Sequence, residues 1–112
     1  MKLITAVIQQ HKLKDVRQAL QEEDIKSMTI STVMGSGSTD SYIETYRGVR
    51  REIHLTKQVK VEIAVNDDLL ERAIDAIISA SRTGEGNDGK IFVVELEQCI
   101  RIRTLERGAK AV

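Results

Sequence analysis

The chain contains two stretches with the same order of elements, and this repetition limits the folds open to it. In the first stretch, the apolar run 3–8 is typical of a strand that is buried on both faces. Leu13, Val16 and Leu20 follow at helical spacing, and an alternating segment then covers about 27–34. The first stretch therefore predicts a strand, a helix and a second strand.

The second stretch repeats this order after the middle of the chain. Residues 59–65 alternate between apolar and polar or small side chains, which indicates a strand. A helix should follow, because Asp68 and Glu71 have the spacing of a capping box. Its apolar stripe would consist of Leu70, Ala73, Ile74, Ile77 and Ile78. The last strand is expected at about 91–96, after the helix ends before Thr83.

A strand–helix–strand unit that occurs twice predicts an α+β, ferredoxin-like βαββαβ fold. This fold has a four-stranded antiparallel sheet with both helices on one face. A length of 112 residues suits one domain that spans 1–112. The other sheet face would lack helical cover, and its apolar side chains favour self-association of the chain through this face.

Composition excludes several classes of function. Lys and Arg total 17, as do Asp and Glu, so no net charge attracts the chain to nucleic acid. The aromatic residues are Phe92, Tyr42 and Tyr46, too few for stacking on bases. Cys99 is the single cysteine, so neither an internal disulfide nor a multi-cysteine zinc site is expected, and no metal site is predicted.

Cys99 and the apolar runs suggest a protein that stays out of the bilayer. Cys99 lies in an apolar, strand-like segment, so a buried small hydrophobe is favoured over a reactive thiol. The apolar runs are too short to cross a membrane, and the first residues lack the pattern of a secretory leader. We therefore expect a cytoplasmic protein without membrane insertion.

The segment 35–57, between the two stretches, does not read as core. It begins with small polar residues and contains few apolar ones. A connection of this length in a small domain is uncommon and is usually functional or disordered. Arg47, Arg50 and Arg51 suit docking into a polar cleft or binding an anion. A hairpin extension without a role is the alternative.

Two further groups of residues suggest a polyphosphate site. The segment 82–90 contains three glycines whose backbone N–H groups could converge on an anion, and Lys90 adds a positive charge. It matches neither the Walker spacing nor the dinucleotide fingerprint, so an ordinary turn is the alternative. Arg101 and Arg103 would share one side of an extended segment and suit phosphate oxygens, although a solvated strand edge is the alternative.

Together these residues are similar to the motifs of a known family. The motifs are Lys12-Leu13 with Asp15-Val16-Arg17 and Ala19-Leu20, Tyr46-Arg47-Gly48, Asp67-Asp68, Thr83-Gly84, Asp88-Gly89-Lys90-Ile91-Phe92-Val93 and Ile100-Arg101-Ile102-Arg103-Thr104. With them in this order and spacing, the chain resembles the PII signal-transduction proteins over essentially its whole length. The resemblance implies a homotrimer that binds ATP or ADP in clefts between neighbouring subunits. It also implies a T-loop at about 36–56 that docks on a protein target: a transporter, a channel or a cytosolic enzyme.

The resemblance also implies which residues meet the nucleotide and the target. Lys90 and the Gly89 backbone would hold phosphates beside Asn87 and Asp88, and Arg101 and Arg103, from the C-terminal segment 100–112, would reach over from the adjacent subunit. The adenine and ribose side would be lined by Val7, Thr29, Gly35, Gly37, Glu62 and Ala64. In the T-loop, the residues expected to contact the target are Tyr42, Tyr46, Arg47, Arg50 and Arg51.

Several positions depart from the family pattern. Thr39 replaces the Gln that coordinates magnesium with ATP, and Gln58 replaces the Lys that pairs with 2-oxoglutarate. Loss of a charge-assisted partner costs about 1.5–3 kcal/mol, and Lys57 should point to the opposite face of its strand. We therefore predict a weak or absent response to 2-oxoglutarate.

Three other replacements concern modification and phosphate binding. Arg51 replaces the Tyr that many members modify, so modification at the usual site is excluded, although Tyr42 and Tyr46 remain. Ser38 stands where an Arg usually contacts phosphate, and Asn87 stands where a Gly is usual in the nucleotide loop. Both replacements bear on nucleotide affinity.

A slow nucleotide or acyl-phosphate hydrolase on the same fold is the alternative function. His11 and His54 are the only histidines, and neither has an evident nucleophile or metal-ligand cluster beside it in the sequence. A regulatory protein rather than an enzyme is therefore favoured.

Overall fold

The computed structural model describes residues 1–36, 42–46, 48–53 and 55–112, and it describes the side chains of these except for 42–46 and 49–53. Short 3-10 turns precede both α-helices, and a third lies near the end of the C-terminal segment. In chain order the elements are β1 (Lys2–Ile8), η1 (Gln10–Lys12), α1 (Leu13–Glu22), β2 (Thr29–Ser36), β3 (Tyr42–Tyr46), β4 (Val49–Ile53), β5 (Leu55–Val65), η2 (Asp67–Leu69), α2 (Leu70–Ser81), β6 (Gly89–Glu95) and η3 (Gly108–Ala111).

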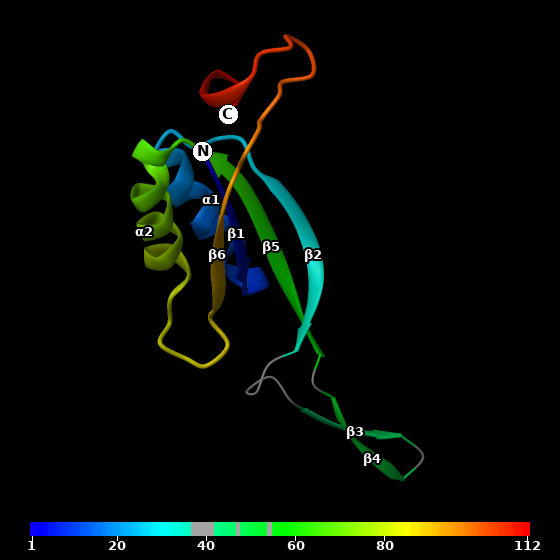
Figure 1. Ribbon diagram of the computed structural model, residues 1–112. Coiled ribbons are helices and arrows are strands. Elements are labelled where there is room, and N and C mark those ends of the chain that lie inside the picture. The colour runs from blue at the N-terminus through cyan, green and yellow to red at the C-terminus, as the bar shows by residue number, and fades with distance from the viewer. Residues whose placement is uncertain (37–41, 47, 54) are drawn as a thin grey trace.

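Four strands form one antiparallel sheet in the order β2-β5-β1-β6, and α1 and α2 lie together on one side of it (Figure 1). The predicted ferredoxin-like fold is confirmed. The four strands and two helices predicted for this fold are present. The bounds of β2 and β6 differ by one or two residues from those predicted, and β5 begins at Leu55, well before Val59.

The core lies between the sheet and the two helices. Alternate residues of β1 and β5 are buried there, together with one stripe of each helix: Ile4, Ala6, Ile8, Val59, Val61, Ile63, Val65, Val16, Leu20, Ala73 and Ile77. Burial of one such Ile or Val side chain contributes about 1.5–3 kcal/mol. The apolar periodicity of the sequence thus determines which face of each element turns inward.

The opposite sheet face carries no helix, as the repeat predicts. Because paired residues share a face, the strand register places Leu3, Thr5 and Val7 on this open face. Phe92 and Val94 of β6 share it and are 53% and 52% exposed. Apolar side chains this exposed are consistent with self-association, while the trimer stays a prediction.

The predicted capping box does not form at α2. The helix begins at Leu70 with Leu69 as its N-cap, so Asp68 lies in η2, one residue too early to cap it. The Leu69 amide instead donates to the carbonyl oxygen of Asn66 at 3.0 Å. The neighbouring Asp67 carboxylate accepts from the N-terminal ammonium and from Lys2 Nζ, both at 3.0 Å, and so ties η2 to β1.

The C-terminal segment also differs from its prediction. Residues 102–104 form a turn rather than an extended stretch, because the Leu105 amide donates back to the Arg101 carbonyl at 2.8 Å. Leu105 has a positive φ of 64° that closes the turn. Ile100 then pairs with Arg107. Arg101 and Arg103 therefore lie on a turn and not along one side of a strand.

Cys99 lies outside any strand, since β6 ends at Glu95. It is partly exposed rather than buried, and its thiol is free. The predicted burial in a strand is therefore wrong at this position. Beyond it the chain returns across the end of the sheet, where the side-chain Nδ2 atom of Asn66 donates to the carbonyl oxygen of Ala109 at 3.2 Å.

The predicted T-loop contains a two-stranded hairpin of β3 and β4, in which Tyr42 pairs with Ile53 and Tyr46 with Val49. Gly48 lies between the strands with a φ of 78°, a value that favours glycine. The hairpin is drawn beyond the ends of β2 and β5 (Figure 1). The described part of this segment thus forms a hairpin, as one of the two alternatives from the sequence has it, and the role of the hairpin stays a prediction.

Candidate functional site

The loop between α2 and β6, residues 82–90, is closed by one carboxylate. Asp88 accepts hydrogen bonds from the Thr83 amide at 2.9 Å, the Gly84 amide at 2.8 Å and the Thr83 hydroxyl. The Thr83 hydroxyl is the main reason why the pKa of Asp88 lies below its usual value. Asp88 thus shapes the loop from within, and its predicted contact with a nucleotide stays a prediction.

Gly89 allows the loop to join β6 directly against β1. Its φ is 105°, and a Cβ placed there would lie 1.8 Å from the carbonyl oxygen of Val7. Only glycine permits this approach of two backbones. The register then places Lys90 opposite Val7, at the start of β6.

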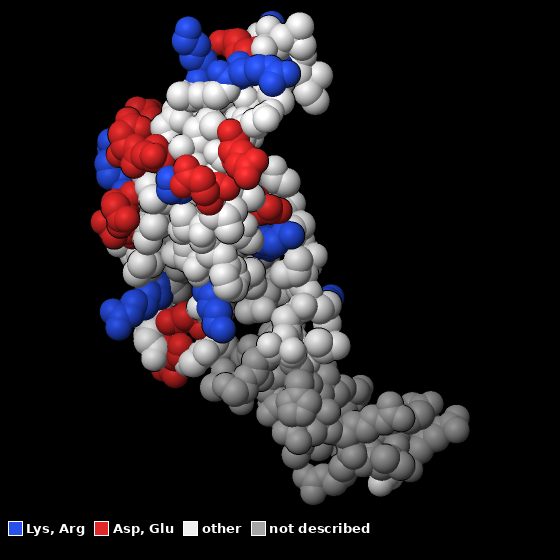
Figure 2. Space-filling view, viewed as in Figure 1, with Lys and Arg blue, Asp and Glu red and all other residues white. Residues whose placement is uncertain are grey.

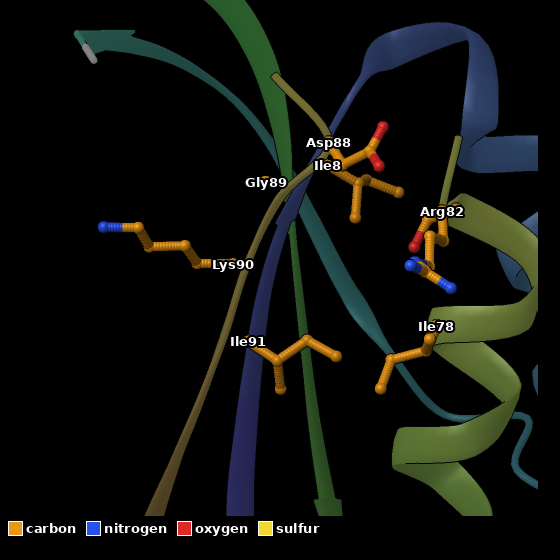
Figure 3. A pocket seen from close by; sticks show the side chains of 8 residues that line it. Ile8, Ile78, Arg82, Asp88, Gly89, Lys90 and Ile91 are labelled. Carbon is orange, nitrogen blue, oxygen red and sulfur yellow. The ribbon is translucent and has the colours of Figure 1, made fainter. Parts of the chain in front are cut away.

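Lys90 extends from the open face of the sheet and is exposed. Figure 3 shows its side chain directed away from a pocket on the helix side of β6, into which Ile8, Ile78 and Ile91 point. That pocket has a volume of about 340 Å³ and a largely apolar lining. The ammonium of Lys90 is therefore presented to the open face, whereas Arg82 and Asp88 are charged residues that line the pocket beside its apolar side chains.

A second hollow lies at the other edge of the open face, beside β2. Its volume is about 660 Å³, and it gathers Thr29, Glu62, Ala64 and Arg101, four of the predicted residues. Glu62 also pairs with Lys60 at 3.5 Å on the same face. Lys26 and Cys99 line this hollow as well, and sequence reasoning did not include them.

The predicted nucleotide residues therefore form two groups. We call Val7, Asn87, Gly89 and Lys90 the β6 group, and Thr29, Glu62, Ala64 and Arg101 the β2 group. All the strand residues among them share the open face, because Thr29 aligns with Glu62 and Val7 with Lys90. Three strand spacings separate Thr29 from Lys90, which corresponds to about 14 Å across the sheet.

The cationic side chains are separated in the same way. Lys90 lies near the start of β6, and Arg101 follows beyond its end at Glu95, so about 16 Å of strand lies between them. Figure 2 shows cationic side chains at the C-terminal segment and at the lower end of the described body, while acidic side chains lie over the middle and again at the lower end. In one copy of the chain, Lys90 and Arg101 therefore lie toward opposite ends of β6.

The remaining predicted residues are placed as follows. Arg103 is exposed in the turn after Arg101, outside the lining of the β2 hollow. Gly35 lies opposite Thr56, and a Cβ there would lie 1.9 Å from the Oε1 atom of Gln58. Gly37, Ser38, Thr39, Arg47 and His54 lie outside the described residues, as do the side chains of Tyr42, Tyr46, Arg50 and Arg51.

Gln9 is a residue of the site that the sequence did not reveal. Its side-chain amide donates to the carbonyl oxygen of Asn87 at 3.1 Å and to Asn87 Oδ1 at 2.9 Å. The only available signal was its position directly after the buried run 3–8, because the end of a strand lies beside the loop that leads into its antiparallel neighbour.

The described residues contain neither a metal-binding cluster nor a membrane-spanning helix. Within the described part of the chain, His, Cys, Asp and Glu side chains do not cluster in a way that could hold a metal ion. His11 lies exposed in η1. In these same residues, neither helix is long and apolar enough to span a bilayer.

Comparison with known proteins decides the family. The family model described as Nitrogen regulatory protein P-II matches residues 1–106. The chain belongs to the P-II family. It is 46% identical over 112 residues to the nitrogen regulatory protein P-II of Bradyrhizobium diazoefficiens, and this alignment covers both chains in full.

Other P-II proteins match over the same range. The nitrogen regulatory protein P-II of Azospirillum brasilense is 43% identical and the nitrogen regulatory protein GlnK of Escherichia coli is 42% identical, each over the full length of both chains. The resemblance to PII proteins is thus confirmed. The chain is a signal-transduction regulator of the P-II family, and these relatives are named as regulatory proteins.

Proposed function

We propose that this P-II regulator binds ATP or ADP in clefts between neighbouring copies of the chain and acts on a protein target through residues 36–56. ATP and ADP are abundant in the cytoplasm, where we place the protein. The two nucleotides would favour different conformers of that segment, and only one conformer would fit the target. A ligand shifts such an equilibrium only through unequal affinity for the two conformers.

The separation of the two residue groups is the observation that supports this proposal. The β6 group offers Lys90 and the glycine-rich loop, both suited to phosphate. The β2 group offers an apolar and polar hollow with Arg101 at its border. Because both groups use the open face but lie at opposite edges, a nucleotide would meet both only if the β2 group of one copy faced the β6 group of the next. Thr29, Glu62 and Ala64 would then come from the same copy as the arginines.

Calorimetric titration of the purified protein with ATP and with ADP tests this proposal. Lys90→Ala should weaken binding by about 10- to 100-fold, since a hydrogen bond to a charged group contributes about 1.5–3 kcal/mol. Lys14→Ala is the matched control, because Lys14 is an exposed lysine of α1. Absence of ATP and ADP binding to the wild-type protein would contradict the proposal.

The structure also bears on the proposed loss of 2-oxoglutarate sensing. Gln58 lies on the open face with its neutral amide against Gly35, and Lys57 belongs to the opposite face, as its pairing with Met34 shows. An amide cannot replace an ammonium opposite a carboxylate. Magnesium could accompany ATP, although Thr39 replaces the usual ligand. We expect 2-oxoglutarate with Mg-ATP to produce no additional heat, and a clear micromolar response would refute this part.

The target is proposed in general terms. A membrane transporter or channel fits the family pattern, and a cytosolic enzyme is the other class. Arg50 and Arg51 of β4 are the residues to substitute first, because their substitution changes the charge of the hairpin and neither belongs to the β6 group or the β2 group. Affinity capture from native lysate with ATP or ADP present would identify a partner whose capture depends on the nucleotide and on both arginines. Capture that depends neither on the nucleotide nor on Arg50 and Arg51 would argue against this role for the hairpin.

A further inference from the structure

The backbone ladder between β1 and β6 ends at Ile8 and Gly89, and a side chain continues the connection beyond it. The Gln9 Nε2 atom donates to the Asn87 carbonyl oxygen at 3.1 Å and to Asn87 Oδ1 at 2.9 Å. Both distances are those of ordinary hydrogen bonds. One amino group with two hydrogens thus binds both oxygens of a single residue.

The donor is held by structure outside the loop. Gln9 has an extended backbone between β1 and η1, and its carbonyl oxygen accepts from the Lys12 amide at 3.0 Å. Its side chain is half-buried. Asp88 therefore closes the loop from within, whereas Gln9 fixes the loop relative to the sheet that carries Val7 and Lys90.

The same contact sets the direction of the Asn87 amide. Because Oδ1 accepts from Gln9, the Nδ2 amino group of Asn87 points the other way. An amino group is a donor and suits phosphate oxygens, whereas a carbonyl oxygen in that position would repel them. Asn87 stands where the family pattern has a glycine, so its side chain must be directed if the loop is to accept an anion.

We propose that Gln9 is a positioning residue of the nucleotide loop: it holds Asn87 so that the loop keeps its shape and presents a donor to the phosphates. This inference rests on the proposed function, because the ligand concerned is the adenine nucleotide. The shape of the loop can nevertheless be measured without ligand. Failure of the two proposals can therefore be distinguished.

Three variants test Gln9. Gln9→Met has a similar length and lacks a donor, whereas Gln9→Lys supplies three donors on an ammonium group. Gln18→Met is the matched control, because Gln18 is exposed on α1. Hydrogen exchange of the amides at 83–89 is measured in the ligand-free protein, and ATP affinity is measured by calorimetry.

We expect the variant without a donor, Gln9→Met, to differ from wild type, and the variant with a donor, Gln9→Lys, to resemble it. Gln9→Met should accelerate loop exchange several-fold and weaken ATP binding by about five- to tenfold, as expected for the loss of one or two neutral hydrogen bonds. Gln9→Lys should keep loop exchange within about twofold of wild type and bind ATP no more weakly. Gln18→Met should change neither quantity.

Other results would overturn the proposal. Unchanged loop exchange in Gln9→Met would show that Gln9 does not position the loop, whatever happens to affinity. Gln9→Lys that is impaired as much as Gln9→Met would show that the donor is not what matters. Faster exchange with unchanged ATP affinity would leave the contact purely structural and contradict its role toward the ligand. If wild-type protein bound neither ATP nor ADP, the proposed function would fail, and with it the role of Gln9 toward phosphate.

Discussion

At the scale of single residues, Gly89 and Gly84 offer a direct test of how the loop 82–90 meets the sheet. Both have positive φ angles, 105° and 90°, but a Cβ would meet the Val7 carbonyl only at Gly89. Substitution by Ala imposes backbone strain at both positions, and at Gly89 it adds a clash between backbones. We expect Gly89→Ala to lower the free energy of unfolding by about 1–3 kcal/mol more than Gly84→Ala does.

Chemical denaturation of both variants measures this difference. Gly84→Ala serves as the control for strain alone, because its Cβ would have open space around it. Equal destabilisation by the two substitutions would mean that β1 and β6 can separate at Ile8 without cost, against the register observed here.

Asp88 predicts a pH dependence of the same loop. Its pKa is lowered from the usual 3.8, first by the Thr83 hydroxyl and then by the Thr83 amide. A carboxyl whose folded pKa is depressed contributes stability above its unfolded pKa and loses it as the pH falls through the folded value. The Thr83 and Gly84 amide resonances should therefore titrate with a midpoint below 3.8.

Nuclear magnetic resonance spectra between about pH 5 and pH 2 would follow these two amides. Asp88→Asn should abolish the step, because an amide does not titrate in this range. A midpoint at or above the ordinary carboxyl value would contradict the hydrogen bonds that Asp88 accepts.

At the scale of elements, two neighbouring isoleucines of α2 allow the effect of burial on stability to be measured apart from the effect of helix propensity. Ile77 is fully buried against the sheet, whereas Ile78 is 43% exposed beside β6. Truncation to Ala should cost about 2–5 kcal/mol at Ile77, and clearly less at Ile78. Urea unfolding measures both costs, with the same dependence of the unfolding free energy on urea concentration assumed for both variants. Similar costs at both positions would mean that α2 is rotated from the orientation described.

Elements with strong periodicity could be predicted from the sequence, and those set by local hydrogen bonds could not. Residues 59–65 and the stripe of α2 indicated strand and helix because burial follows their spacing. The start of α2 lies one residue later than predicted, since Leu69 and not Asp68 is the N-cap residue. The turn at 102–104 depends on the positive φ of Leu105, a conformation that its side chain does not favour. The extent of β5 could not be seen because Leu55, Lys57 and Gln58 do not alternate as a core strand does.

At the scale of the whole molecule, the family resemblance predicts that Arg101 and Arg103 meet the nucleotide from the adjacent subunit, but the sequence does not show how the predicted residues are distributed over one sheet. Sequence spacing does not show which residues share an edge of the sheet. The register supplies this by placing Thr29 and Lys90 on the same face at opposite edges. The Gln9 contact with Asn87 was likewise invisible, because the two residues are 78 positions apart in the chain.

Mixed oligomers test whether the two groups meet between copies. Lys90→Ala removes the ammonium of the β6 group, and the double variant Arg101→Ala with Arg103→Ala removes the guanidinium groups of the C-terminal turn. Each protein alone should bind ATP weakly. After refolding of an equal mixture, a head-to-tail contact with both intact halves should occur at about a quarter of the interfaces.

Calorimetric stoichiometry distinguishes the two arrangements. If the site forms between copies, the mixture should regain about a quarter of the wild-type sites at wild-type affinity, because an intact β6 group then faces an intact Arg101. If each site lay within one copy, every site in the mixture would carry a defect and none would be regained. Each variant refolded alone is the control, and recovery there would point to refolding rather than complementation. A regained fraction therefore requires that Lys90 and Arg101, separated in one copy by the length of β6, reach the same nucleotide from two.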